Sequence, residues 1–317
     1  MDGVKEIAII GGGPAGLTAA LYACRARMDV ILLERFACGG QVLLTDSIEN
    51  YPGFPEGIKG PELAEWMYKQ AEHFGLKTLN AEAKNIIVKN GPEPRFKITL
   101  NDGTEVLSHS IIVATGASWN SLGVPGEKEL LGKGVSYCAT CDGPLFRGKD
   151  VVVVGGGDTA LEDALFLAKF AGKVTLIHRR DRFRGTKILQ ERVLSNPKIE
   201  VIFNSLLTEI KGQNRCESAI LKDVNTAQPK EVKTSGVFIF IGMKPNSEVV
   251  KGLVDMDEKG YVISNLEMST SCEGIFACGD VRSKVLRQVS TAVGDGAAAA
   301  FNAQHYVENL KGTGYPA

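Results

Sequence analysis

The 317-residue sequence has no long apolar run and no excess of either charge. Apolar stretches such as 151–154 and 237–241 are far shorter than the ~18 residues that a membrane-spanning helix needs. Lys and Arg number 36 against 37 Asp and Glu, which leaves a net charge of −1. We therefore expect a protein that binds neither a membrane nor nucleic acid, although a local basic patch is compatible with this balance.

The number of cysteines is small and odd, which does not fit an extracellular disulfide framework. The sequence has seven cysteines, an odd number. Its first residues, Met1 to Glu6, are acidic and lead directly into an apolar stretch, so we expect no signal peptide. An odd number of cysteines without an export signal argues against a disulfide scaffold. The sequence therefore predicts a cytoplasmic protein whose cysteines are mostly reduced.

Glycine, in contrast, is abundant, and it is concentrated in two copies of one pattern. There are 36 glycines in 317 residues, about 11% against a usual ~7%. Each copy reads as a buried strand, a glycine turn, a helix and a second strand. The first copy occupies 7–10, 11–16, 17–26 and 30–33, and the second occupies 151–154, 155–160, 161–170 and 173–177. Each then closes with an apolar strand that ends at glycine, at 110–116 and 235–242.

This duplication predicts an α/β fold with two Rossmann-like, three-layer dinucleotide-binding domains, the second inserted into the first. The length also favours two domains, at ~100–200 residues each. Linkers are expected near 117–126 and 243–246. The tail holds an apolar strand at 274–278 and an Ala-rich helix at about 285–309, too little for a third domain. We expect domains at 1–117 with 246–317 and at 118–245.

Both glycine turns satisfy the dinucleotide fingerprint, as Gly11-x-Gly13-x-x-Gly16 and Gly155-x-Gly157-x-x-Ala160. The first glycine allows a tight turn, the second lets a pyrophosphate approach the backbone, and the third small residue lets helix pack on strand. The following helix offers unpaired N–H groups to the phosphates. Two purely structural turns are the alternative. The candidate cofactor residues are Gly11, Gly13, Pro14, Ala15, Gly16, Gly155, Gly157, Asp158, Thr159 and Ala160.

The ends of the second strands distinguish the two sites. Glu34 follows Gly11 by 23 positions, and an acid there accepts hydrogen bonds from a ribose 2′-hydroxyl, as in FAD or NAD. The same offset from Gly155 gives His178, and guanidinium groups beyond it pair well with a 2′-phosphate. This second site therefore favours NADPH over NADH, and the alternative is a solvated basic loop. The residues of the second site are His178, Arg179, Arg180 and Arg184.

Cys138 and Cys141 form the only CxxC pair, in Cys-Ala-Thr-Cys-Asp-Gly. A structural zinc site usually needs a second CxxC or a His pair, which are missing nearby, so we expect no metal. A structural disulfide is disfavoured in the cytosol. A redox-active disulfide remains, because CxxC spacing lowers a thiol pKa towards ~7 and supplies thiolate for exchange. Asp142 is either a proton carrier for this pair or a helix-cap or turn residue.

With these motifs, the whole chain resembles the low-molecular-weight bacterial thioredoxin reductases, class II members of the pyridine nucleotide-disulfide oxidoreductase family. The run at 138–143 carries the resemblance, together with His178-Arg179-Arg180 and Arg184. The stretch 270–280, Thr-Ser-Cys-Glu-Gly-Ile-Phe-Ala-Cys-Gly-Asp, resembles the family's second FAD motif, and Arg287-Gln288-Val289 follows it.

The resemblance implies specific roles for these residues. FAD would be held by the first fingerprint and by Glu34, Gly40, Gln41, Asn50, Gly279, Asp280, Arg287, Gln288 and Val289. Cys141 would be the sulfur on the flavin side, and Cys138 would attack thioredoxin. The family is homodimeric. Its inserted NADPH domain rotates on two linkers, because the dithiol must serve both a flavin and a protein partner.

Other functions are compatible with parts of this pattern. A flavoprotein reductase could serve another disulfide carrier, such as a peroxiredoxin or a glutaredoxin-like protein, but members of that kind usually carry a second CxxC. A reductase supplied by ferredoxin would not need the arginines of the second site. A non-catalytic NADPH sensor would use both turns but would leave the CxxC unexplained.

Overall fold

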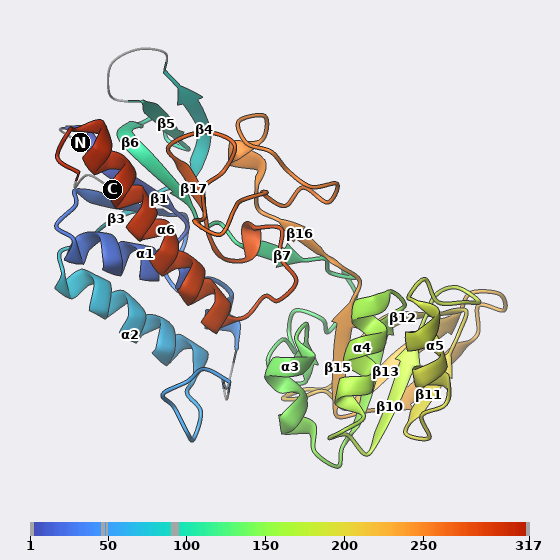
Figure 1. The fold of residues 1–317 in the computed structure, drawn as a ribbon. Helices are drawn as coiled ribbons and strands as arrows, with labels where there is room; N and C mark the ends of the chain where they lie inside the picture. Colours follow the sequence, from blue (N-terminus) through green and yellow to red (C-terminus); the bar gives the residue numbers. More distant parts are fainter. Residues whose placement is uncertain (1–2, 46–47, 49, 90–94, 315–317) are drawn as a thin grey trace. The chain divides into compact units, whose positions relative to one another are not determined.

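The structure, a computed structural model, describes residues 3–45, 48, 50–89 and 95–314. The chain divides into two compact units, coloured along the sequence in Figure 1. The first unit comprises Met1–Asp46, Tyr51–Ser118 and Lys244–Ala317, and the second comprises Ser47–Asn50 and Trp119–Met243. Among the described residues, no helix combines the length and apolar character needed to cross a membrane.

The first unit is built on a seven-stranded sheet with the order β3-β2-β1-β6-β5-β4, in which β17 also pairs with β6. Five strands run parallel: β1 (Lys5–Ile10), β2 (Val30–Glu34), β3 (Lys77–Asn80), β6 (Glu105–Val113) and β17 (Ile275–Ala277). The antiparallel edge is formed by β4 (Ala83–Val88) and β5 (Phe96–Leu100). Strand β17 comes from the tail of the chain, so the tail completes this sheet.

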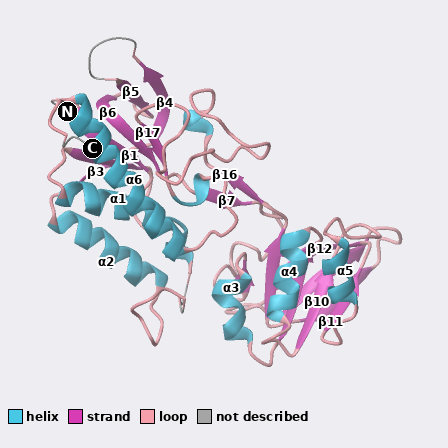
Figure 2. Ribbon diagram, in the orientation of Figure 1, coloured by secondary structure: helices cyan, strands magenta, loops and turns pink. Residues whose placement is uncertain are grey.

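Helices cover one face of this sheet, as Figure 2 shows. They are α1 (Pro14–Arg25), α2 (Gly60–His73) and α6 (Val289–Leu310). Alanines on α1 and α6 pack against alternate side chains of β1 such as Ile7 and Ile9, all of them buried. The other residues of β1 face a second core formed with β5, β6 and the tail, and this two-sided burial explains the continuous apolar run of the strand.

The second unit repeats this plan with a five-stranded parallel sheet in the order β11-β10-β9-β15-β8. Its strands are β8 (Val135–Ser136), β9 (Asp150–Gly155), β10 (Lys173–Ile177), β11 (Ile199–Ile202) and β15 (Gly236–Phe240). Its helices are α3 (Ala139–Asp142), α4 (Asp158–Leu167) and α5 (Lys187–Leu194). A separate antiparallel sheet contains β12 (Ser205–Lys211), β13 (Ser218–Asp223) and β14 (Pro229–Lys233). The two predicted Rossmann-like parallel sheets are thus confirmed.

The starts of three helices differ from the sequence prediction. Helix α4 begins at Asp158 and α1 at Pro14, because the last residues of each fingerprint already form the first helical turn. Helix α6 begins at Val289, four residues later than predicted. There Thr291 Oγ1 accepts a hydrogen bond from the Gln288 backbone N–H at 3.1 Å, so Gln288 caps the helix.

The two segments predicted as linkers pair with each other. Strand β7 (Ala117–Trp119) and β16 (Met243–Pro245), which lie in the segments expected as linkers, form a two-stranded sheet. At one end the Asn246 N–H donates to the Gly116 carbonyl oxygen at 3.0 Å, and at the other the Asn120 N–H donates to Gly242 at 3.0 Å. The connection between the units is therefore a short β-ribbon at this point.

The third fingerprint position differs between the two units for a steric reason. A Cβ on Gly16 would lie 1.8 Å from the Gly11 carbonyl oxygen, so only glycine fits. In the second unit the third position is Ala160, and glycine is required at Gly155 instead. A Cβ on Gly155 would lie 2.5 Å from the Ala160 Cβ. In both turns the strand and helix approach closely, but only the first leaves no space for a methyl group.

We predict that Gly16→Ala lowers the free energy of unfolding by about 3 kcal/mol, because a backbone shift must relieve the clash. Ala160→Gly is the matched variant and should cost only about 1–2 kcal/mol, from helix propensity and one lost buried methyl. Urea titration followed by far-ultraviolet circular dichroism measures both. Equal losses for the two variants would contradict this steric account.

Candidate functional site

The first glycine turn is fastened to the end of β2. The Gly12 backbone N–H donates to Glu34 Oε2 at 2.7 Å, and the Phe36 N–H donates to Glu34 Oε1 at 3.0 Å. Gly11 has φ of +106°, and a Cβ there would lie 2.5 Å from the Ala114 carbonyl oxygen. Glu34, which was predicted to bind a ribose, is therefore held beside the turn by the backbone, and each oxygen keeps a further lone pair for a hydroxyl.

Two distant segments of the first unit also lie against this turn. A Cβ on Gly40, in the 3₁₀ turn η1 (Gly40–Leu44), would lie 3.1 Å from Gly13 Cα. A Cβ on Gly279, in η4 (Gly279–Val281), would lie 2.8 Å from the Ala15 Cβ. The Gln41 side-chain amide donates to the Ala117 carbonyl oxygen. The structure thus brings together the fingerprint, Gly40-Gln41 and the tail motif at Gly279, as an extended cofactor with a pyrophosphate would require.

A buried charge cluster surrounds Asp280 at the same place. Arg282 Nη1 lies 3.0 Å and Lys284 Nζ 2.9 Å from the Asp295 carboxylate, and Lys284 Nζ lies 3.8 Å from Asp280 Oδ1. Burial raises the pKa of Asp280. Asp280 Oδ1 is buried and accepts no hydrogen bond within the part of the chain that the structure describes. An acceptor with no donor fits a ligand hydroxyl, such as one on the ribityl chain of FAD.

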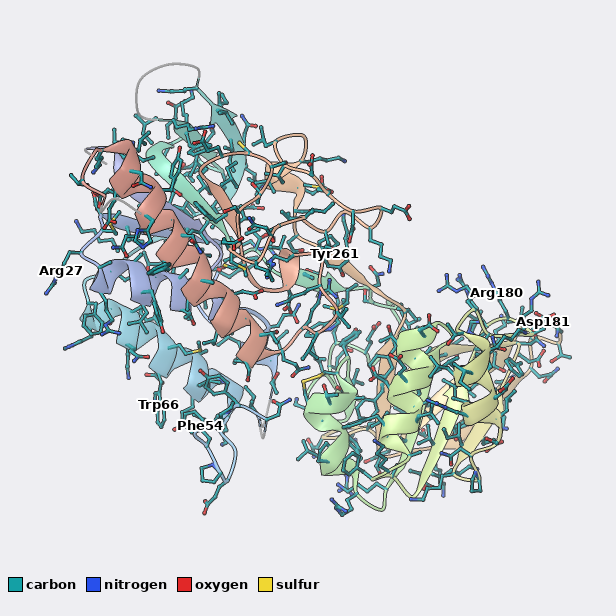
Figure 3. The ribbon with its side chains drawn as sticks, viewed as in Figure 1. Arg27, Phe54, Trp66, Arg180, Asp181 and Tyr261 are labelled. Atoms are coloured by element: carbon teal, nitrogen blue, oxygen red, sulfur yellow. A yellow bond between two sulfur atoms is a disulfide. The ribbon has the colours of Figure 1, made fainter. Side chains whose placement is uncertain are left out.

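Arg287 is held between Asp280 and an aromatic ring. Its Nε donates to the Asp280 carbonyl oxygen at 3.3 Å, and its guanidinium carbon lies 4.1 Å from the centroid of the buried Tyr261 ring, labelled in Figure 3. Gln288 and Val289 follow directly, at the start of α6. Asn50 is exposed, in the stretch between η1 and α2. The charge cluster of Arg282, Lys284 and Asp295 was not predicted, because no motif connects these positions.

The second glycine turn is fastened by a histidine. His178 Nδ1 lies 2.9 Å from the Gly155 carbonyl oxygen, which can only accept, so Nδ1 carries the proton. Burial lowers the pKa of His178, and the neighbouring arginines lower it further, so the ring is neutral near pH 7. Nε2 is buried and has no hydrogen-bond partner among the described residues. His178 therefore supports the turn and presents an acceptor, which suits a sugar hydroxyl better than a phosphate.

The arginines of the second site are exposed and form no ion pair with a carboxylate of the described residues. Figure 3 shows the side chains around the labelled Arg180 extending away from the ribbon. The Arg184 backbone N–H donates to the Gly156 carbonyl oxygen at 2.7 Å, and the Thr186 N–H donates to Asp158 Oδ1 at 2.6 Å. The arginine loop is thus fixed to the glycine turn, and residues 179–184 carry four arginines and one aspartate. Thr159 and Ala160 follow in the first turn of α4.

Cys138 and Cys141 form a disulfide, with their Cα atoms 5.3 Å apart. Cys138 caps α3, and its Sγ accepts the Cys141 backbone N–H at 3.2 Å and lies 3.4 Å from Thr140 Oγ1. Asp142 ends α3, and its backbone N–H donates to the Cys138 carbonyl oxygen at 3.2 Å. Donors directed at Cys138 Sγ would stabilise its thiolate once the disulfide is reduced.

The other five cysteines are free thiols; Cys24, Cys216 and Cys278 are buried, and Cys38 and Cys272 are half-buried. Burial raises the pKa of Cys24, Cys38 and Cys216 to about 11 and that of Cys278 to about 12. The pKa of Cys272 is raised for the same reason. No group of three or more His, Cys, Asp or Glu side chains among the described residues is placed to hold a metal ion. Thiol chemistry is therefore concentrated at Cys138 and Cys141.

One structural cluster beside the disulfide was missed from the sequence. Glu127 is buried and accepts hydrogen bonds from the Tyr137 hydroxyl and from backbone N–H groups of 122–124. Tyr137 directly precedes Cys138, and its ring stacks on Trp119 with centroids 5.0 Å apart. A Gly- and Pro-containing stretch reads as a solvated linker, so nothing in the sequence indicated a buried carboxylate there.

Known proteins share this arrangement. A family model described as pyridine nucleotide-disulphide oxidoreductase matches residues 5–296. The thioredoxin reductase of Bacillus subtilis (strain 168) is 46% identical over 311 residues, covering 98% of this chain and 97% of the relative. That of Treponema pallidum (strain Nichols) is 47% identical over 314 residues, covering 98% and 100%.

A solved structure agrees with these sequence matches. The crystal structure of thioredoxin reductase from Streptococcus pyogenes MGAS5005 superposes with a TM-score of 0.92 at 44% identity, covering 98% of this chain and 100% of that one. These matches span the residues of both parallel sheets and of Cys138 and Cys141 in this chain. The chain therefore belongs to the pyridine nucleotide-disulphide oxidoreductase family, and within it to the low-molecular-weight bacterial thioredoxin reductases.

Proposed function

We propose that this chain reduces the disulfide of thioredoxin with electrons from NADPH. The observation that carries the proposal is the single disulfide, Cys138–Cys141, in a chain whose other five cysteines are free and mostly buried. The disulfide lies in the same unit as the glycine turn with the exposed arginines. A pyridine nucleotide-disulfide reductase needs both a nicotinamide site and a redox disulfide, and this unit holds candidates for both.

We assign FAD to residues 1–117 and 246–317, and NADPH to residues 118–245. Bound FAD and NADPH would supply the hydride and electron-pair chemistry that side chains lack. In the first unit Glu34 would bind the adenosine ribose and Asp280 the ribityl hydroxyls, since both present free acceptor capacity. In the second unit Arg179, Arg180 and Arg184 would bind the 2′-phosphate, and the start of α4 would receive the pyrophosphate.

The protein's own thiols would carry the last exchange. The Cys138 thiolate attacks one sulfur of the thioredoxin disulfide, forming a mixed disulfide and releasing the other thioredoxin sulfur as a thiolate. The Cys141 thiolate then attacks Cys138 Sγ, which re-forms the Cys138–Cys141 disulfide and releases the second thioredoxin thiolate. Two electrons and two protons pass to thioredoxin in total. Asp142, in the turn directly after Cys141, would carry a proton to or from the dithiol.

The disulfide must meet both a flavin and a protein partner, which one fixed arrangement of the chain cannot satisfy. We propose rotation of the second unit on its two connecting segments, near 117–126 and 243–246. Two copies of the chain would associate as a homodimer, as the family resemblance implies. Light scattering should then give a mass of twice the 34.0 kDa of the chain, and a value of one chain mass would contradict the dimer.

Replacing Cys138 by Ser should abolish thioredoxin reduction, by at least about a thousandfold, because the attacking thiol is lost and Cys141 alone cannot re-form the disulfide. Bleaching of the flavin absorbance by NADPH should persist. Cys272→Ser is the matched control and should behave as the unaltered protein. Steady-state NADPH oxidation with oxidised thioredoxin measures turnover, and substantial turnover by Cys138→Ser would contradict the proposal.

Replacing Arg179 and Arg180 together by Ala should raise the KM for NADPH about tenfold or more, because charge-assisted hydrogen bonds to the 2′-phosphate are lost. The KM for NADH should change little, since NADH lacks that phosphate. Arg192→Ala, an exposed arginine on α5, is the control for loss of a positive charge. Equal changes for the two nucleotides would mean that the arginines do not recognise the phosphate.

A further inference from the structure

The carboxylate of Glu127 organises the segment by which the chain enters the second unit. Only 1% of Glu127 is exposed. Oε1 accepts the Leu122 backbone N–H at 2.9 Å and the Tyr137 hydroxyl at 2.5 Å. Oε2 accepts the backbone N–H groups of Gly123 at 2.6 Å and Val124 at 3.3 Å. Four donors from two separate stretches of chain therefore converge on one side chain.

This carboxylate is stabilised by hydrogen bonds alone. No basic side chain of the described residues forms an ion pair with Glu127. A buried charge is costly unless it is paired or fully hydrogen-bonded, and four donors satisfy both oxygens of a carboxylate. Burial and the neighbouring Glu127 raise the pKa of Tyr137, so its hydroxyl stays protonated and donates. Removing any one donor leaves lone-pair capacity unmet at a site that water does not reach.

The entering segment is also fastened to the body of the second unit. The Trp119 and Tyr137 rings stack with an interplanar angle of 12°. The Ile210 N–H donates to the Pro125 carbonyl oxygen at 2.9 Å. Gly126 has φ of +86°, and a Cβ there would lie 1.9 Å from the Ile210 carbonyl oxygen. Residues 119–127 are thus packed and hydrogen-bonded within the second unit, although their Gly- and Pro-containing sequence is typical of a linker.

Tyr137 passes this constraint to the redox disulfide. Tyr137 connects the last residue of β8, Ser136, to Cys138. The Ser136 Oγ also accepts a hydrogen bond from the Cys138 backbone N–H at 3.0 Å. The Tyr137 side chain points to Glu127 and its backbone positions the first sulfur-bearing residue. Fixing the Tyr137 hydroxyl therefore fixes Cys138 relative to the entering segment.

We propose that Glu127 is a positioning residue that, through Tyr137, makes the entering segment and the Cys138–Cys141 disulfide one rigid piece. The first connecting segment of the proposed rotation, given above as near 117–126, then narrows to Ala117 and Ser118 of β7, which pair with β16. A rotation about the β7–β16 ribbon then moves the disulfide by the same angle, because residues 119–124 do not bend independently of it. This inference rests on the proposed function for its catalytic consequence, but the anchor itself can be measured independently.

The test uses the FAD-loaded full chain with Tyr137→Phe, which removes only the hydroxyl, and Glu127→Gln. The matched controls are Tyr22→Phe and Glu129→Gln, both exposed positions. Hydrogen exchange measures protection of the amides of residues 122–124, and circular dichroism verifies folding. Both variants should lose that protection by about tenfold or more, since a buried charge-assisted hydrogen bond is lost or its acceptor is altered, and the controls should not.

The kinetic arm compares kcat and KM with oxidised thioredoxin. Both variants should lower kcat about tenfold with an unchanged KM, because the disulfide is misplaced while its partner surface is intact. Unchanged kcat, or a lowered kcat without loss of amide protection, would overturn the proposal. If the unaltered protein reduces no thioredoxin, the proposed function fails, and the same comparison is made with a small aromatic disulfide. Equal kcat values on that substrate would then overturn the inference.

Discussion

The close approach of backbone to backbone at the two glycine turns is the constraint on which the rest of the structure depends. At Gly11 and Gly16 the carbonyl groups lie where a side chain would begin, so strand β1 can pass directly into α1. The same closeness occurs at Gly155 in the second unit. Helix N-termini therefore open at the carboxyl ends of the strands, which is where open α/β sheets bind their ligands.

Each turn is supported by a side chain at the end of the following strand. The two side chains, however, differ in their chemistry. In the first unit Glu34 accepts the Gly12 N–H, and in the second His178 donates to the Gly155 carbonyl oxygen. The acid supports the turn and remains an acceptor for ribose hydroxyls. The neutral histidine supports its turn, and in the proposed function the exposed arginines beyond it bind the 2′-phosphate. The two turns are thus supported from positions at equal offsets by side chains of different chemistry, as the proposed pair of nucleotides would require.

The sequence was sufficient where function depends on local backbone rules. Glycine spacing, the positions of Glu34 and His178, and the CxxC pair are all read within short stretches, and the parallel sheets follow from them. It was insufficient where chain segments meet from a distance. Asp295 on α6 pairs with Arg282 and Lys284 from the preceding loop, and the buried Glu127 accepts hydrogen bonds both from residues 122–124 and from Tyr137. The position of Gln288 as a helix cap likewise depends on one side-chain contact that periodicity does not reveal.

The central claim is that electrons leave this protein through Cys138 to thioredoxin. The most direct measurement is NADPH-dependent reduction of a chromogenic disulfide by the unaltered protein, with and without added thioredoxin. The account predicts turnover that depends on thioredoxin and saturates with its concentration. Bleaching of the flavin by NADPH with no acceleration by thioredoxin would contradict the account and would indicate a different disulfide carrier.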